Sequence, residues 1–125
     1  LSSPSGYEPS KIALKNAQDS GISTIEITRD PQKAVKDADV IYTDVWASMG
    51  QETEQAQRLR DFLPFQVNAD LMSHAKEDCY VMHCLPAHRG DEITDEILDG
   101  PNSIVFDEAE NRMHVQKAIM VTLMG

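Results

Sequence analysis

Short runs of β-branched and aromatic residues alternate along this chain with longer polar segments. Four such runs predict strands, and they span residues 23–28, 39–44, 79–85 and 103–107. The segment at the N-terminus is expected to form the tail of a fifth strand. Because strands alternate with helical segments, the pattern predicts a three-layer α/β sandwich, with a parallel sheet of four to five strands and helices on both faces.

The polar segments carry the spacing and the end signals of helices. Helices are expected over residues 8–20, 30–38, 51–62, 68–75, 91–100 and 109–124. Asp30, followed by Pro31, and Asn68 are expected N-caps. The last helix is apolar almost all round from Ala118 onward, which predicts burial on more than one side. If nothing covers it, we expect exposed apolar surface there and self-association.

Polar side chains collect at the ends of the predicted strands. These strands end at Asp44, Cys84 and Asp107, and the third runs from the apolar "VMH" into "CLPAHRG" at 84–90. In an open parallel sheet, ligands bind at the carboxyl ends of the strands. Adjacent strands lie about 5 Å apart, so Asp44 and Cys84 are expected to touch if their strands are neighbours.

Each candidate residue also has an ordinary structural explanation. For Cys84 the ordinary role is that of a small buried apolar residue, and for Asp44 it is a cap of the turn that follows. For Ser48 the ordinary role is an N-cap, for Met49 it is a core residue, and for Arg112 it is a solvated surface charge. The residues alone leave these alternatives open. Outside the candidate edge, we expect structural or surface roles only, for Cys79, Trp46, His74 and His114.

Composition and motifs argue against several classes of protein. The formal net charge of −10 disfavours nucleic acids and anionic membranes as partners, and no apolar run is long enough to span a membrane. Two cysteines are too few for a disulfide scaffold, so a reducing cytoplasm is expected. No glycine-rich phosphate loop occurs, and no set of residues has metal-ligand spacing. His83 and Cys84 are successive strand residues on opposite faces, which argues against a Cys–His dyad.

Three motifs together resemble the ornithine carbamoyltransferase family. They are "DVWASMGQE" at 44–52, "MHCLPAHRGDE" at 82–92 and "FDEAENRMHVQKA" at 106–118, and "SPSGYEP" at 3–9 and "FQVNADLM" at 65–72 also match. The likeness covers essentially the whole chain. It implies a Rossmann-like half of a carbamoyltransferase, with residues 1–125 forming a single ornithine-binding domain. The "SMG" segment favours ornithine over putrescine, and "HCLP" favours it over aspartate.

The resemblance implies roles for individual residues. Asp44 is expected to receive the α-amino group of ornithine, while Ser48 and the Met49 backbone hold its amino-acid end. Cys84 is expected beside the attacking side-chain amine, which makes Cys84 and Asp44 the catalytic candidates. The Cys84–Leu85 backbone and Arg112 are expected to contact carbamoyl phosphate. No metal and no cofactor are implied.

The resemblance also has a gap. Family members are more than twice as long, and their "STRTR"-type and "HPxQ" segments, which bind carbamoyl phosphate, do not occur here. We therefore expect an ornithine-binding domain without its N-terminal partner domain, inactive alone, and a homotrimer for the whole enzyme. The alternative is a stand-alone amino-acid-binding or regulatory module with the same fold.

Overall fold

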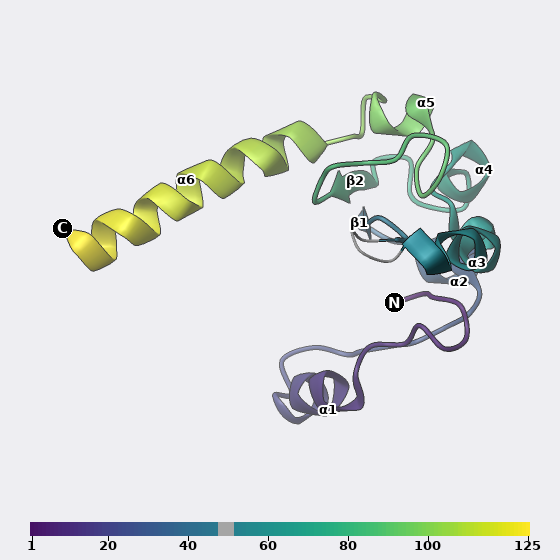
Figure 1. The fold of residues 1–125 in the computed structure, drawn as a ribbon, viewed down its shortest axis with the longest axis horizontal. Coiled ribbons are helices and arrows are strands. Elements are labelled where there is room, and N and C mark those ends of the chain that lie inside the picture. Colours follow the sequence, from purple (N-terminus) through teal and green to yellow (C-terminus); the bar gives the residue numbers. More distant parts are fainter. Residues whose placement is uncertain (48–51) are drawn as a thin grey trace.

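Two parallel strands form the centre of the fold, β1 (Val40–Thr43) and β2 (Tyr80–His83). The computed structural model describes residues 1–47 and 52–125. The strands pair in register, with Ile41 opposite Val81 and Thr43 opposite His83. In Figure 1 they lie beside the short helices of the central part of the chain. The α/β class and the parallel sheet predicted from the sequence are confirmed.

Among the residues that the structure describes, the sheet has fewer strands than the four to five expected. Residues 23–28 form only one parallel bridge, between Thr28 and Ser2. This segment pairs with the N-terminal residues instead of with β1, since the Thr28 amide donates to the Leu1 carbonyl over 3.0 Å. The two segments expected to form the first and fifth strands, at 23–28 and at the N-terminus, therefore hydrogen-bond to each other.

The prediction of a strand at 103–107 is wrong. Residues 102–104 pair briefly with β2, because the Val81 amide donates to the Asn102 carbonyl and the Ile104 amide donates to the Val81 carbonyl, each over 2.9 Å. Helix α6 then begins at Val105. Asp107 and Glu108 fall in its first turn, where carboxylates are favourable beside the free amides of a helix N-terminus. Asp107 is therefore a helix residue and not a strand end.

The remaining elements follow the predicted order along the chain. They are α1 (Lys11–Asp19), α2 (Pro31–Val35), α3 (Glu52–Phe62), the 3-10 helix η1 (Leu63–Phe65), α4 (Ala69–Met72), α5 (Asp95–Leu98) and α6 (Val105–Met124). The two predicted N-caps are confirmed: Asp30 Oδ1 accepts from the Lys33 amide over 3.1 Å, and Asn68 Oδ1 accepts from the Leu71 amide over 3.0 Å. Helix α1 ends just before Gly21, whose φ of 63° suits a residue without a side chain.

The core lies on one face of the two strands. Its buried residues come from β1, β2, the short helices and the segments between them, and they are Val35, Ile41, Val67, Leu71, Cys79, Val81, Ile93, Leu98 and Val105. Cys79 is fully buried, which confirms its structural role. On the other face, Val40, Tyr42 and Tyr80 are exposed. The described residues thus cover one face of the sheet fully and leave much of the other exposed.

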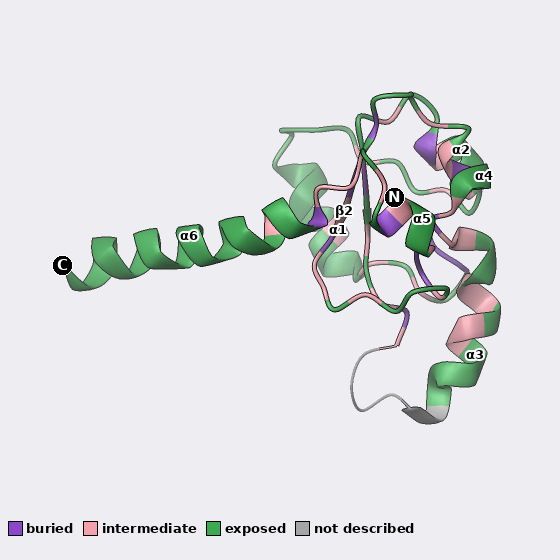
Figure 2. Cartoon of the chain, turned by 90° about the horizontal axis from the view of Figure 1, so that it is seen from above, coloured by how far each residue is buried: buried purple, intermediate pink, exposed green. Residues whose placement is uncertain are grey.

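Helix α6 projects away from the core, as Figures 1 and 2 both show. Only Val105, at its start, is buried. Towards its end Ile119, Val121 and Leu123 are 51%, 72% and 78% exposed. The uncovered apolar surface expected at this end is therefore confirmed. Within residues 1–47 and 52–125, none of the helices combines the length and the apolar character needed to cross a membrane.

Candidate functional site

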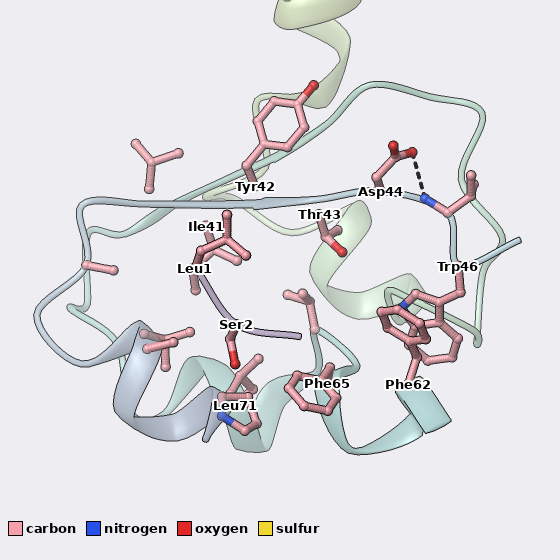
Figure 3. A pocket seen from close by; sticks show the side chains of 17 residues that line it. Leu1, Ser2, Ile41, Tyr42, Thr43, Asp44, Trp46, Phe62, Phe65 and Leu71 are labelled. Atoms are coloured by element: carbon pink, nitrogen blue, oxygen red, sulfur yellow. Dashed lines mark hydrogen bonds between the residues drawn. The ribbon is translucent and has the colours of Figure 1, made fainter. Parts of the chain in front are cut away.

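Asp44 and Cys84 meet at the carboxyl ends of β1 and β2. Thr43 and His83 are the last residues paired between these strands, so the next residue of each strand arrives at the same place. The Cys84 thiol donates a hydrogen bond to Asp44 Oδ1 over 3.0 Å. The same oxygen accepts from the Val45 amide over 2.7 Å, as Figure 3 shows. The contact expected from the two strand ends is confirmed.

The carboxylate controls the ionisation of the thiol. The hydrogen bond to Asp44 raises the pKa of Cys84, and partial burial and the negative charge of Asp44 raise it further. A thiolate beside a carboxylate is disfavoured because two like charges would lie within hydrogen-bonding distance. Cysteine nucleophiles have lowered pKa values, so this environment suits a neutral thiol that orients a ligand and argues against covalent catalysis.

A pocket of about 560 Å³ opens between α6 and the turn that follows β2, residues 84–88. It is lined by Cys84, Leu85, Pro86, Ala109, Arg112, Met113 and Gln116. The three residues that were expected to contact carbamoyl phosphate, Cys84, Leu85 and Arg112, therefore border one cavity. Arg112 lies in the second turn of α6, because the helix begins earlier than predicted, and it is exposed.

A hydrogen bond between β1 and α6 was not predicted from the sequence. The Tyr42 hydroxyl donates to Glu108 Oε1 over 2.8 Å. This hydrogen bond is the largest cause that raises the pKa of Tyr42 to about 12, with contributions from desolvation, the charge of Glu108 and the nearby Cys84. Because Glu108 and Arg112 share α6, the bond fixes the start of the helix that carries Arg112 over the pocket.

A second pocket, of about 390 Å³, lies on the other side of Asp44 (Figure 3). Its lining is mainly aliphatic and aromatic, and Asp44 stands at one end. Trp46 is buried beside it and stacks on Phe62, with 5.9 Å between ring centroids. The predicted role of Trp46 as a packing anchor is confirmed.

His83 approaches the site but forms no dyad with Cys84. Ligand atoms of Asp44, His83 and Cys84 lie within 4.8 Å of one another, although their sequence spacing is not that of a metal site. Both ring nitrogens of His83 are already engaged, one with Glu92 and the other with the Leu85 amide. A cation would have to displace one of these buried contacts, so the trio is a poor cation site in this conformation.

Some of the other residues named in the sequence analysis lie outside the described part of the chain and the rest lie within it. Ser48 and Met49 lie outside the described residues. His74 and His114 are exposed, as expected, and His114 contacts Glu110 on its own helix. Glu92 was not singled out from the sequence. Its one available signal was its place at the end of the "HCLPAHRGDE" motif.

Comparisons with known proteins identify the family of this chain. The family model for the aspartate/ornithine carbamoyltransferase Asp/Orn binding domain matches residues 1–123. Ornithine carbamoyltransferase of Pyrococcus horikoshii is 60% identical over 129 residues, which cover 100% of this chain and 40% of that protein. The chain thus spans about two fifths of the length of this relative.

Solved structures show the same likeness. Ornithine carbamoyltransferase from Pyrococcus furiosus superposes with a TM-score of 0.84 at 60% identity, covering 94% of this chain and 38% of that one. The enzyme from Gloeobacter violaceus gives a TM-score of 0.86 at 42% identity, covering 99% of this chain and 41% of that one. The resemblance seen in the sequence motifs is confirmed: this chain belongs to the aspartate/ornithine carbamoyltransferase family and corresponds to its Asp/Orn-binding domain.

Proposed function

We propose that this chain is the ornithine-binding part of an ornithine carbamoyltransferase, which transfers the carbamoyl group of carbamoyl phosphate to L-ornithine and gives L-citrulline and phosphate. The observation that carries the proposal is the Cys84–Asp44 hydrogen bond at the sheet edge, beside the pocket that Leu85 and Arg112 also line. The relatives named ornithine carbamoyltransferase match along the whole chain at about 60% identity, which does not favour a stand-alone binding module.

Asp44 supplies the negative charge that a zwitterionic amino acid needs. Its carboxylate is exposed, so it can meet the α-ammonium of ornithine, as charge-assisted hydrogen bonding favours. We assign Ser48 and the Met49 backbone to the amino-acid end of the ligand. The Cys84 thiol then lies next to the side-chain amine and orients it for attack.

The reaction follows from this placement. The neutral amine nitrogen forms a bond to the carbamoyl carbon, a tetrahedral intermediate results, and the carbon–oxygen bond to phosphate breaks with its electron pair on the phosphate. The amine loses a proton in the same sequence. The chain's contribution is positioning and stabilisation of charge. The Arg112 guanidinium suits the phosphate oxygens.

The turn after β2 offers acceptors to the carbamoyl group. The Leu85 amide is already bound to His83, so the carbonyl oxygens of Cys84 and Leu85 are the groups we assign to the carbamoyl NH₂. The remaining contacts to carbamoyl phosphate would come from a second domain that closes over this one. We propose that the whole enzyme is a homo-oligomer, a trimer by family resemblance, and that it is cytoplasmic.

The test is carbamoyl transfer from carbamoyl phosphate in two preparations, followed as citrulline for ornithine and as released phosphate for the comparison substrates. A protein that joins this chain to a carbamoyl-phosphate-binding domain should carbamoylate ornithine, and the 125-residue chain alone should not. Nα-acetylornithine, putrescine and aspartate serve as comparison substrates, since they lack the α-ammonium, the α-carboxylate and the side-chain amine respectively. Preference for any of the three over ornithine would contradict the proposal, as would sustained turnover by the chain alone.

A further inference from the structure

His83 and Glu92 form a completely buried pair beside the Cys84 turn. Neither side chain has exposed surface, and His83 Nε2 lies 2.9 Å from Glu92 Oε1. Burying ionisable groups is unfavourable unless they are well hydrogen-bonded. Leucine or methionine would fill the same space at lower cost, so the polar pair points to a task that packing alone does not explain.

The second ring nitrogen of His83 holds the backbone of the turn. The Leu85 amide donates to His83 Nδ1 over 2.9 Å. Nδ1 therefore carries no proton, and Nε2–H is left to donate to Glu92. Leu85 has a φ of 54°, in the left-handed region that bulky residues avoid. Such a conformation persists only where its surroundings hold it, and the His83 ring supplies one of the contacts that do so.

Glu92 holds the far end of the same turn. Its Oε1 accepts from the His88 amide over 2.7 Å, in addition to the contact with His83. One carboxylate oxygen thus connects the end of β2 with residue 88. Glu92 is itself anchored, because its carbonyl accepts from the Val67 amide over 2.9 Å and the adjacent Ile93 is fully buried.

We propose that the buried His83–Glu92 pair is a positioning device, which holds the 84–88 turn so that the Cys84 thiol faces the Asp44 carboxylate. His83 precedes Cys84 and its ring binds the residue that follows Cys84, so the thiol is held from both sides. The use of that thiol in carbamoyl transfer rests on the proposed function. The positioning is a property of the folded chain and is measured without turnover.

The test follows Cys84 by its rate of alkylation with iodoacetamide as a function of pH, read on its own peptide by mass spectrometry. His83→Gln keeps a donor for Glu92 and removes the acceptor for the Leu85 amide. We expect the Cys84 pKa to fall in this variant, because the thiol no longer faces the Asp44 carboxylate, so alkylation should begin at a lower pH. Glu92→Met, which removes the acceptor for His83 and His88, should act in the same direction.

Two controls separate positioning from general loosening of the turn. Glu92→Gln retains an acceptor oxygen for both donors and should keep the high thiol pKa. Arg89→Ala removes the side chain directly after this turn, which among the described residues binds the exposed Asp95 and Asp99, and it should also leave the thiol unchanged. Circular dichroism and thermal melting identify the variants that fold.

A further test uses the unsubstituted chain, so its result does not depend on whether a variant folds. Its Leu85 amide should exchange with solvent at least roughly a hundredfold more slowly than a free peptide amide. Unprotected exchange at Leu85, or a folded His83→Gln variant with unchanged alkylation, would overturn the proposal. If the alkylation result holds and the joined enzyme does not carbamoylate ornithine, the positioning stands and the proposed function fails.

Discussion

The Cys84 thiol donates a hydrogen bond to the Asp44 carboxylate over 3.0 Å, although 40 residues separate the two in sequence. The parallel pairing of β1 and β2 produces this contact, because it brings two strand ends to one edge. The carboxylate raises the pKa of the thiol and so disfavours the thiolate. Asp44 and Cys84 therefore act as one unit, and a change in either residue should be visible in the other.

Asp44→Asn should lower the pKa of Cys84 towards that of an ordinary thiol. The substitution removes both the charge and the strongest hydrogen-bond acceptor beside the sulfur, the two effects of Asp44 that raise the pKa. Alkylation of Cys84 should therefore begin at a lower pH than in the unsubstituted chain. Asp95→Asn, which removes an exposed carboxylate near Arg89 instead, is the matched control and should leave the profile unchanged. An identical profile for Asp44→Asn would contradict the contact.

The Tyr42–Glu108 bond should make stability depend on pH in the alkaline range. The pKa of Tyr42 is raised from 10.0 to about 12 in the folded chain. A group with a raised pKa contributes stability that is fully present below its unfolded value and lost as pH rises through its folded value. The contribution should thus disappear between about pH 10 and 12, as followed by denaturant melts. Tyr42→Phe should remove that loss, and an unchanged alkaline loss would contradict the assignment.

Ile93→Ala should destabilise the chain strongly. Ile93 has no exposed surface and lies in the core next to Glu92. Truncation of such a side chain costs about 2–5 kcal/mol in free energy of unfolding. The matched control is Ile12→Ala, the same chemical change at a side chain that is 76% exposed, which should cost less than about 0.5 kcal/mol. Urea denaturation measures both, and equal losses would show that the core is misplaced.

The apolar end of α6 should cause self-association of the 125-residue chain. Leu123 and Met124 are 78% and 83% exposed, and their apolar neighbours on the helix are exposed as well. Light scattering should detect dimers or larger species that diminish in the double variant Leu123→Gln, Met124→Gln. Ile22→Gln is the control, because Ile22 is 89% exposed but lies outside this helix. A strictly monomeric chain with protected amides over 118–124 would contradict the account.

The sequence was sufficient for the class of fold and for the central contact of the site. The alternation of strands and helices predicts a parallel sheet, and strand ends of a parallel sheet meet at one edge, so Asp44 and Cys84 were predictable as a pair. Asp30 and Asn68 were predictable as caps because their side chains match a local requirement of the backbone.

The sequence was insufficient where long-range contacts decide the outcome. "SIVFD" has the composition of a strand, but the acidic residues at 107 and 108 favour a helix start, and only three residues pair with β2 before the chain turns. The His83–Glu92 pair could not be predicted from spacing, because nine positions and an irregular turn separate the two residues. Burial of a charged side chain has no local pattern to reveal it.

The most direct test of the account is turnover by an enzyme in which this chain, carrying Cys84→Ala, is joined to a carbamoyl-phosphate-binding domain. We expect the rate of citrulline formation to fall by roughly 10²–10⁴, as for loss of a group that acts at the reacting atoms. The free energy of unfolding should fall by less than about 1 kcal/mol, because Cys84 is only partly buried at the edge of the site. Normal turnover together with a large loss of stability would show that Cys84 is a packing residue and would contradict the account.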